Sequence, residues 1–83
     1  MELLPRIKLI LGDALGLGAR AEQLTSESRL LGEIPEFDSM AVVTVVTMIE
    51  EEFGITLEGD ELTAQTFATL GTLSDLVSRK LLT

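Results

Sequence analysis

The sequence predicts an all-α fold, in which three main helices and one short helix form a small four-helix bundle. The chain has 83 residues, which suits a single domain over residues 1–83 with one modest core. Hydrophobic residues make up 46% of the chain but only three residues are aromatic. The core must therefore be aliphatic, which favours packed helices over an aromatic-rich sandwich. Apolar side chains also recur at helical spacing in three separate segments.

The first helix is expected from Leu3 to Leu15, where the apolar residues follow helical spacing. Pro5 suits the first turn of this helix, and Gly16 and Gly18 end the pattern. The stretch over residues 16–37 has no periodic pattern. A structureless loop of that length is uncommon in a compact domain, so we expect a short turn near residues 29–32 and isolated apolar anchors, namely Leu17, Leu24, Leu30, Leu31, Ile34 and Phe37.

The second helix is expected from Ser39 to Phe53, although this segment is rich in β-branched residues that favour strands. Its apolar residues fall in pairs, with Thr44 and Thr47 between them, so a narrow polar stripe recurs at helical spacing. Asp38 is a suitable N-cap, and Gly54 suits the C-terminal stop. These end signals favour a helix over a strand.

The remainder of the chain predicts a loop, a short helical turn and a last helix. Residues 57–67 contain Gly59 and then Asp60, with few residues to fix the segment rigidly. Thr69 or Thr72 can cap the last helix, which ends in basic residues that complement the helix dipole. One face of this helix is apolar, at Leu70, Leu73, Leu76, Val77 and Leu81.

The net charge of −8 is unevenly distributed. No Lys or Arg occurs from Leu30 to Ser78, where there are ten acidic residues: Glu33, Glu36, Asp38, Glu50, Glu51, Glu52, Glu58, Asp60, Glu61 and Asp75. Such a negative field repels nucleic acid and attracts a basic partner surface. A face that merely keeps the protein in solution is the alternative interpretation.

Several function classes are excluded by composition. The chain has no Cys and no His, which removes disulfides, the usual zinc sites and the thiol and imidazole catalysts. The loop over residues 57–62 lacks the spaced ligands of an EF-hand. We expect no catalytic residue and no metal site. No stretch reaches the roughly 18 apolar residues of a membrane span, and the N-terminus shows no secretion signal, so a cytoplasmic protein is expected.

Three motifs together resemble the acyl carrier protein family. LGEIPEFDSM at residues 31–40 leads into an apolar helix, EEEFGI at residues 50–55 closes that helix, and TLGTL at residues 69–73 begins the last one. The resemblance spans most of the chain. It implies a four-helix bundle of the acyl-carrier type, and a non-catalytic protein that carries acyl groups as thioesters in fatty acid or polyketide biosynthesis.

The resemblance implies that Ser39 is the attachment point for 4'-phosphopantetheine, which a phosphopantetheinyl transferase takes from coenzyme A. The site suits this chemistry, because a hydroxyl at a helix N-terminus is accessible and the resulting phosphodiester anion meets free N–H groups and the positive end of the helix dipole. A serine that merely belongs to the N-cap is the alternative.

The family also implies docking by partner enzymes with basic surfaces, which load and transfer the acyl group. The residues expected to dock are Asp38, Met40, Glu50 and Glu51. Carboxylates in the last turn of a helix oppose its dipole, each at a cost of about 0.3–1 kcal/mol, so their presence there invites a functional reason. The residues expected to line a pocket for the acyl chain are Val43, Val46, Ile49, Leu57, Leu62 and Phe67.

The chain departs from the family pattern near Ser39. Met40 replaces the commoner leucine, and Ala41 and Thr44 replace acidic residues. These differences indicate dedicated partners, such as those of a specialised or exosortase-associated cluster. A peptidyl or aminoacyl carrier, which usually has Gly-Gly ahead of the serine, and an unmodified acidic helical adaptor are the alternatives. A monomer is expected.

Overall fold

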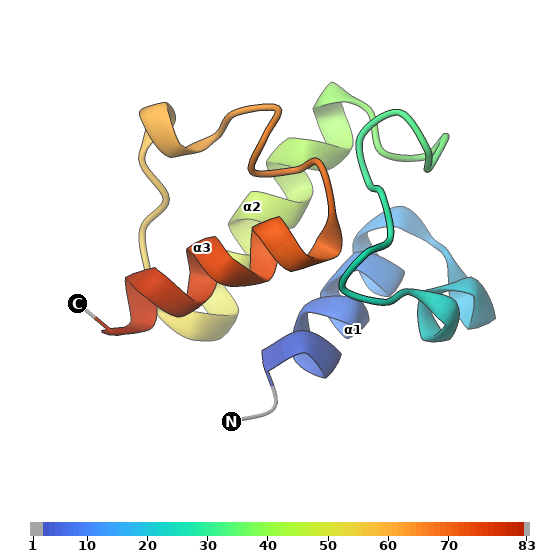
Figure 1. The fold of residues 1–83 in the computed structure, drawn as a ribbon, viewed down its shortest axis with the longest axis horizontal. Coiled ribbons are helices and arrows are strands. Elements are labelled where there is room, and N and C mark those ends of the chain that lie inside the picture. Colours follow the sequence, from blue (N-terminus) through green and yellow to red (C-terminus); the bar gives the residue numbers. More distant parts are fainter. Residues whose placement is uncertain (1–2, 83) are drawn as a thin grey trace.

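The computed structural model describes residues 3–82 and contains three α-helices and two short 3₁₀ helices. Their order is α1 (Leu3–Leu15), η1 (Gly18–Gln23), α2 (Ser39–Phe53), η2 (Gly59–Glu61) and α3 (Leu70–Leu82), as Figure 1 shows. The predicted all-α fold is confirmed, with the predicted bounds for the first two helices. The short helix expected after residue 57 is a single 3₁₀ turn, and η1 was not predicted.

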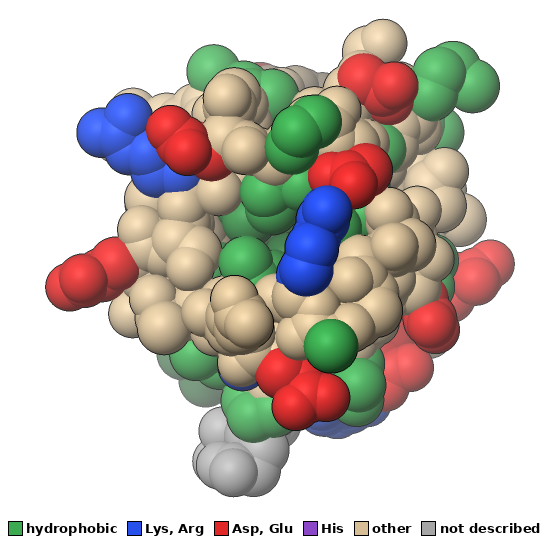
Figure 2. Space-filling model, turned by 90° about the vertical axis from the view of Figure 1, so that its right-hand side faces the viewer, with side chains coloured by type: hydrophobic (Ala, Val, Ile, Leu, Met, Phe, Trp, Pro, Cys, Tyr) green, Lys and Arg blue, Asp and Glu red, His purple; other side chains and the backbone are tan. Residues whose placement is uncertain are grey.

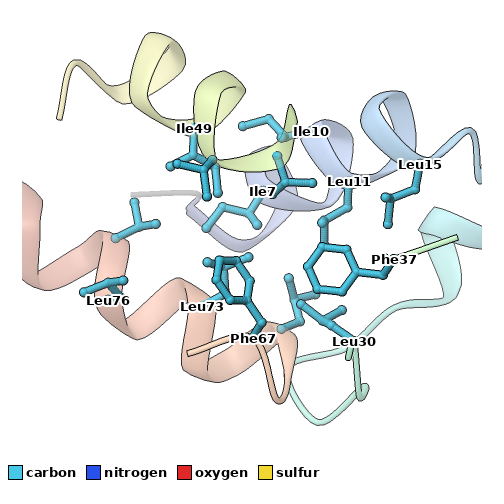
Figure 3. Packing of buried hydrophobic residues seen from close by; sticks show 14 of the residues in the cluster. Ile7, Ile10, Leu11, Leu15, Leu30, Phe37, Ile49, Phe67, Leu73 and Leu76 are labelled. Atoms are coloured by element: carbon cyan, nitrogen blue, oxygen red, sulfur yellow. The ribbon is translucent and has the colours of Figure 1, made fainter. Parts of the chain in front are cut away.

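All three α-helices contribute to one aliphatic core, in which α1 contacts both α2 and α3. Figure 3 shows the side chains meeting between the helices. The buried residues of α1, α2 and α3 are Ile7, Ile10, Leu11, Leu15, Val45, Val46, Ile49, Leu70, Leu73, Leu76 and Val77. The connecting segments add Leu17, Ala21, Leu30, Phe37, Leu57 and Phe67. No polar or charged residue is buried within residues 3–82.

The long segment between α1 and α2 is anchored by most of the residues predicted to do so. Leu17, Leu30 and Phe37 are buried, and two others are half-buried at Leu24 and Ile34. Leu31 was predicted wrongly as an anchor, since it is 44% exposed. Leu31 lies in the tight turn over residues 31–33, where Gly32 has a positive φ of 89° that favours glycine.

Backbone hydrogen bonds join this segment to the start of α3. Arg29 and Thr69 form an isolated antiparallel bridge, with Leu30 N donating to Ala68 O at 3.0 Å. Gly71 N donates to Ser26 O at 2.8 Å. A Cβ atom at Gly71 would lie 2.7 Å from that same oxygen, so the close approach of the two backbones requires glycine.

Both candidate caps of α3 are used. Thr69 Oγ1 accepts from Thr72 N at 3.1 Å, and Thr72 Oγ1 accepts from Thr69 N, also at 3.1 Å. This reciprocal arrangement satisfies two backbone donors at the helix start, as a capping box does.

Polar contacts tie down the segment between α2 and α3, where few fixing residues were expected. Glu61 Oε1 accepts from Glu58 N at 2.8 Å and from Lys80 Nζ at 3.0 Å. These two contacts, the backbone one first, lower the pKa of the Glu61 carboxyl. Thr66 Oγ1 donates to Glu61 O at 2.6 Å, and Thr72 Oγ1 donates to Thr66 O at 2.9 Å. Three of these contacts join residues three to six positions apart, and one comes from Lys80, which is 19 residues after Glu61. The segment therefore has more polar contacts than its sequence indicated.

Among residues 3–82, none of the helices is both long enough and apolar enough to cross a membrane. The same residues contain no group of three or more acidic side chains placed to hold a metal ion.

Candidate functional site

Ser39 is the first residue of α2 and its side chain is exposed. The cap of this helix is supplied by Asp38, whose Oδ1 accepts from Ala41 N at 2.9 Å. The Ser39 hydroxyl forms no hydrogen bond within residues 3–82. The serine is therefore accessible and takes no part in the cap.

The start of α2 suits an attached anion. The N–H groups of Ser39 and Met40 begin the helix and, by helix geometry, have no partner inside it. The positive end of the helix dipole lies at the same point, and together these features favour a phosphate at a helix N-terminus. A phosphodiester on the Ser39 oxygen would fit there without displacing a buried side chain.

The loop that presents Ser39 is held on two sides. Glu36 Oε2 lies 2.7 Å from a guanidinium nitrogen of Arg20 in η1, and this contact is the main reason why the pKa of Glu36 is lowered. On the core side, the Phe37 ring packs against the Phe67 ring with 5.6 Å between centroids (Figure 3). The sequence did not indicate the Arg20 contact, because no local pattern links two opposite charges in separate loops.

Next to this loop is a small hollow of about 160 Å³, with walls at Leu17, Arg20, Leu24, Glu33, Ile34 and Pro35. Figure 2 faces the side of the molecule that carries the loops between α1 and α2, where hydrophobic side chains are visible in a central hollow among acidic and basic ones. The loop before Ser39 thus rests on an apolar base with charged groups at its rim.

The three glutamates at the end of α2 have three different environments. Glu50 is half-buried and its Oε2 accepts from Leu57 N at 2.8 Å, while its backbone oxygen accepts from Gly54 N. Glu52 forms an ion pair with Arg6, whose guanidinium also lies 4.8 Å from the centre of the Phe53 ring. Only Glu51 is exposed without such a partner within residues 3–82. The structure thus gives two of these carboxylates a structural reason to oppose the helix dipole.

Ion pairs also reduce the negative field read from the sequence. Three of the ten acidic residues between Leu30 and Ser78 pair with cations from outside that range: Glu36 with Arg20, Glu52 with Arg6, and Glu61 with Lys80. These ion pairs therefore neutralise part of the negative charge in this range, and the other seven acidic residues form no ion pair within residues 3–82. Pairing could not be predicted, since each cation lies far from its partner in sequence.

The outward face of α2 is apolar near Ser39 and acidic at its far end. Met40 is 75% exposed and Val43 is 62% exposed. Thr44 and Thr47 follow on the exposed side, and Glu51 lies one turn beyond Thr47. A partner approaching this face would meet hydrophobic side chains beside Ser39 and a free carboxylate about 18 Å along the helix axis, at the rise of 1.5 Å per residue.

Four of the six residues expected to line an acyl pocket are brought together in the core: Val46, Ile49, Leu57 and Phe67. Leu62 is half-buried and packs against this core. Val43 lies apart from them on the outward face of α2. All four side chains are buried in the core, so an acyl chain that lay among them would have to displace core side chains.

Comparisons with known proteins agree with this geometry. A family model described as a phosphopantetheine attachment site matches residues 5–77. Among solved structures, the chain is similar to the holo acyl carrier protein from Nitrosomonas europaea, with 52% sequence identity over 100% of both chains and a TM-score of 0.94.

Proposed function

Because the chain belongs to the acyl carrier protein family, we propose that Ser39 is the residue through which it carries acyl groups between enzymes. Members of this family hold 4'-phosphopantetheine covalently, and the thiol of that group holds an acyl chain as a thioester. The carrier fold is non-catalytic. The alternatives of a peptidyl or aminoacyl carrier and of an unmodified adaptor are not favoured by the family and structural matches.

The observation that carries the proposal is the position of Ser39. Its hydroxyl is exposed at a helix N-terminus that Asp38 already caps. A transferase can reach the oxygen, and the free N–H groups of the first turn stabilise the phosphodiester that forms.

In the proposed modification, Ser39 Oγ attacks the phosphorus that bears the pantetheine half of coenzyme A. A new phosphorus–oxygen bond forms, the pyrophosphate bond breaks, and adenosine 3',5'-bisphosphate leaves. The serine proton passes to a base of the transferase. Incubation with coenzyme A, magnesium and a broad-specificity phosphopantetheinyl transferase tests this: the intact mass should rise by one phosphopantetheine group, whereas an adaptor would gain nothing.

We propose that partner enzymes dock on the exposed face of α2 around Met40 and Glu51. Of the other two predicted docking residues, Asp38 caps the helix and Glu50 binds the backbone at Leu57, so both have a structural role beside any role in docking.

We predict that Glu51→Lys slows association with a basic partner surface, because an attractive exposed charge becomes repulsive. Rising salt should slow wild-type association as well. Stopped-flow association rates between the loaded carrier and a transferring enzyme measure both effects.

The matched control for this prediction is Glu22→Lys in η1, an exposed residue away from α2 that changes the net charge equally. Equal slowing by both variants would show that only the total charge matters and would contradict docking at Glu51. Rates that do not change with Glu51→Lys or with salt would contradict it as well.

We also propose that the acyl chain is sheltered among Val46, Ile49, Leu57, Leu62 and Phe67. Burying each methylene group contributes about 0.8 kcal/mol, and a group that binds only the folded state raises its stability. Loading a medium-length acyl chain should therefore raise the melting temperature and slow amide exchange over residues 57–67. The carrier loaded with an acetyl group is the control, and identical melting and exchange in the two forms would show that the chain stays in solvent.

The pathway and the setting of this carrier are the last part of the proposal. The unusual residues Met40, Ala41 and Thr44 support dedicated partners of a specialised pathway, and an exosortase-associated cluster is one such setting. A cytoplasmic monomer stays a prediction, which sedimentation of the purified chain and fractionation of cells would check.

A further inference from the structure

A polar cavity of about 340 Å³, broadly open to solvent, lies between the turn at residues 63–66 and α3. Its volume is within the range of small-molecule sites. All the lining side chains are polar: Thr63, Gln65, Thr66, Thr72, Asp75 and Arg79. A hydrocarbon chain would gain little there, so the cavity suits a ligand that carries hydrogen-bonding groups.

Two walls of this cavity are fixed by the protein itself. Thr66 Oγ1 donates to Glu61 O at 2.6 Å, and Thr72 Oγ1 donates to Thr66 O at 2.9 Å. The threonine methyl groups and backbone are therefore held in place without a ligand. The cavity is a formed feature of the segment that leads into α3.

Three other lining groups keep free hydrogen-bonding capacity. Asp75 and Arg79 are one turn apart on α3, where opposite charges often pair, yet within residues 3–82 neither forms an ion pair. The Arg79 charge does contribute to lowering the pKa of Glu61, but without a hydrogen bond. The side-chain amide of Gln65 also forms no hydrogen bond within residues 3–82. The cavity thus offers a carboxylate acceptor, a guanidinium donor and an amide that does both.

The segment that lines the cavity is connected to the start of α2 by a ring contact. Phe67, next to the cavity residue Thr66, packs against Phe37, which is two residues before Ser39. In Figure 1 the segment that leads from η2 into α3 and the start of α2 lie along the same upper edge of the molecule. A phosphopantetheine arm has about as many chain bonds as a five-residue peptide, so when extended it reaches about 16 Å.

We propose that this cavity is a binding site for the pantetheine part of the arm, an inference that rests on the proposed function of Ser39. The arm contains two secondary amides and one hydroxyl. Its carbonyl groups can accept from Arg79 and Gln65, and its N–H and hydroxyl groups can donate to Asp75. The apolar acyl chain then belongs to the core and the polar arm to this separate site beside α3.

The test compares apo and holo forms of the full chain in wild type, in the double variant Gln65→Ala/Asp75→Asn, and in a matched control. The control is Gln23→Ala/Asp13→Asn, which makes the same chemical changes at two exposed positions outside the cavity. Two readouts are used: amide shifts in ¹H–¹⁵N spectra, and the rate at which a neutral maleimide reacts with the arm thiol.

On conversion from apo to holo, amides of residues 63–66 and 72–79 should shift in wild type and in the control, and these shifts should shrink in the cavity variant. The thiol should react more slowly than free pantetheine, and the cavity variant should restore the rate by up to about tenfold, as expected for the loss of one or two hydrogen bonds. A holo form whose shifts are confined to the start of α2 would overturn the cavity site and leave Ser39 as the attachment point. A chain that takes no arm at all would overturn both proposals.

Discussion

Replacing Ser39 by alanine is expected to abolish phosphopantetheine attachment completely while leaving the fold intact. The reaction needs one hydroxyl at the start of α2, and the neighbouring cap is supplied by Asp38. Because Ser39 is exposed, its loss should change the free energy of unfolding by well under about 1 kcal/mol. Intact mass after treatment with the transferase, together with helicity and thermal melting, measures the two effects side by side.

Ser26→Ala is a suitable control, since this serine is also exposed and its hydroxyl forms no hydrogen bond within residues 3–82. It should retain the full gain in mass. A Ser39→Ala variant that is still modified would show that another residue carries the arm. A variant that unfolds would show that Ser39 takes part in the helix start after all.

Replacing Gly71 by alanine is expected to cause a large loss of stability. An added Cβ would lie 2.7 Å from the backbone oxygen of Ser26, which cannot rotate away as a flexible side chain could. The clash would also strain the hydrogen bond from Gly71 N to that oxygen. Overpacking of this kind costs about 1–3 kcal/mol, and each kcal/mol lowers the melting temperature of a small domain by roughly 4–8 °C.

Gly71 lies in the first turn of α3, and alanine is a better helix former than glycine. Helix propensity alone would therefore make Gly71→Ala stabilising, whereas the clash makes it destabilising. Gly59→Ala serves as the control, since nothing lies within 4 Å of a Cβ atom there and its φ is not positive. Thermal melting of both variants decides the matter. Equal stability of Gly71→Ala and wild type would contradict the close packing of residues 25–31 on α3.

The helices were predictable because their signals are local. α2 is the instructive case, since its β-branched residues favour a strand by propensity, yet Asp38 caps its start and Gly54 ends it with φ of 66°. The helical spacing of its apolar residues and these two end signals favoured a helix more strongly than the β-branched residues favoured a strand. The candidate attachment residue was identified differently, from the resemblance of residues 31–40 to the family motif.

The contacts between distant segments were not predictable. The ion pair between Arg20 and Glu36 and the bridge between Arg29 and Thr69 exist only because the loops meet in space. No residue pattern within either loop indicates its partner. The short η1 helix was missed for a related reason, since its sequence has no clear periodicity and it is ordered by packing against α1.

The role of Glu50 shows that contacts which the sequence does not indicate also affect the functional interpretation. From the sequence, the three glutamates at the end of α2 formed one acidic run with one purpose. In the structure, Glu50 holds the backbone at Leu57 and Glu52 pairs with Arg6, so only Glu51 is left for a partner. Charge patterns in a sequence give the sign of a surface, whereas the folded contacts decide which charges a partner meets.

The most direct test of the central claim is to locate the attached group on the wild-type protein. After treatment with the transferase and coenzyme A, cleavage at glutamate releases the peptide of residues 37–50, in which Ser39 is the only serine and Thr44 and Thr47 the only threonines. Fragmentation in the mass spectrometer should place one phosphopantetheine group on Ser39 and nowhere else. A group found on either threonine or on another peptide, or no added mass with several transferases, would contradict the assignment of Ser39 as the attachment site.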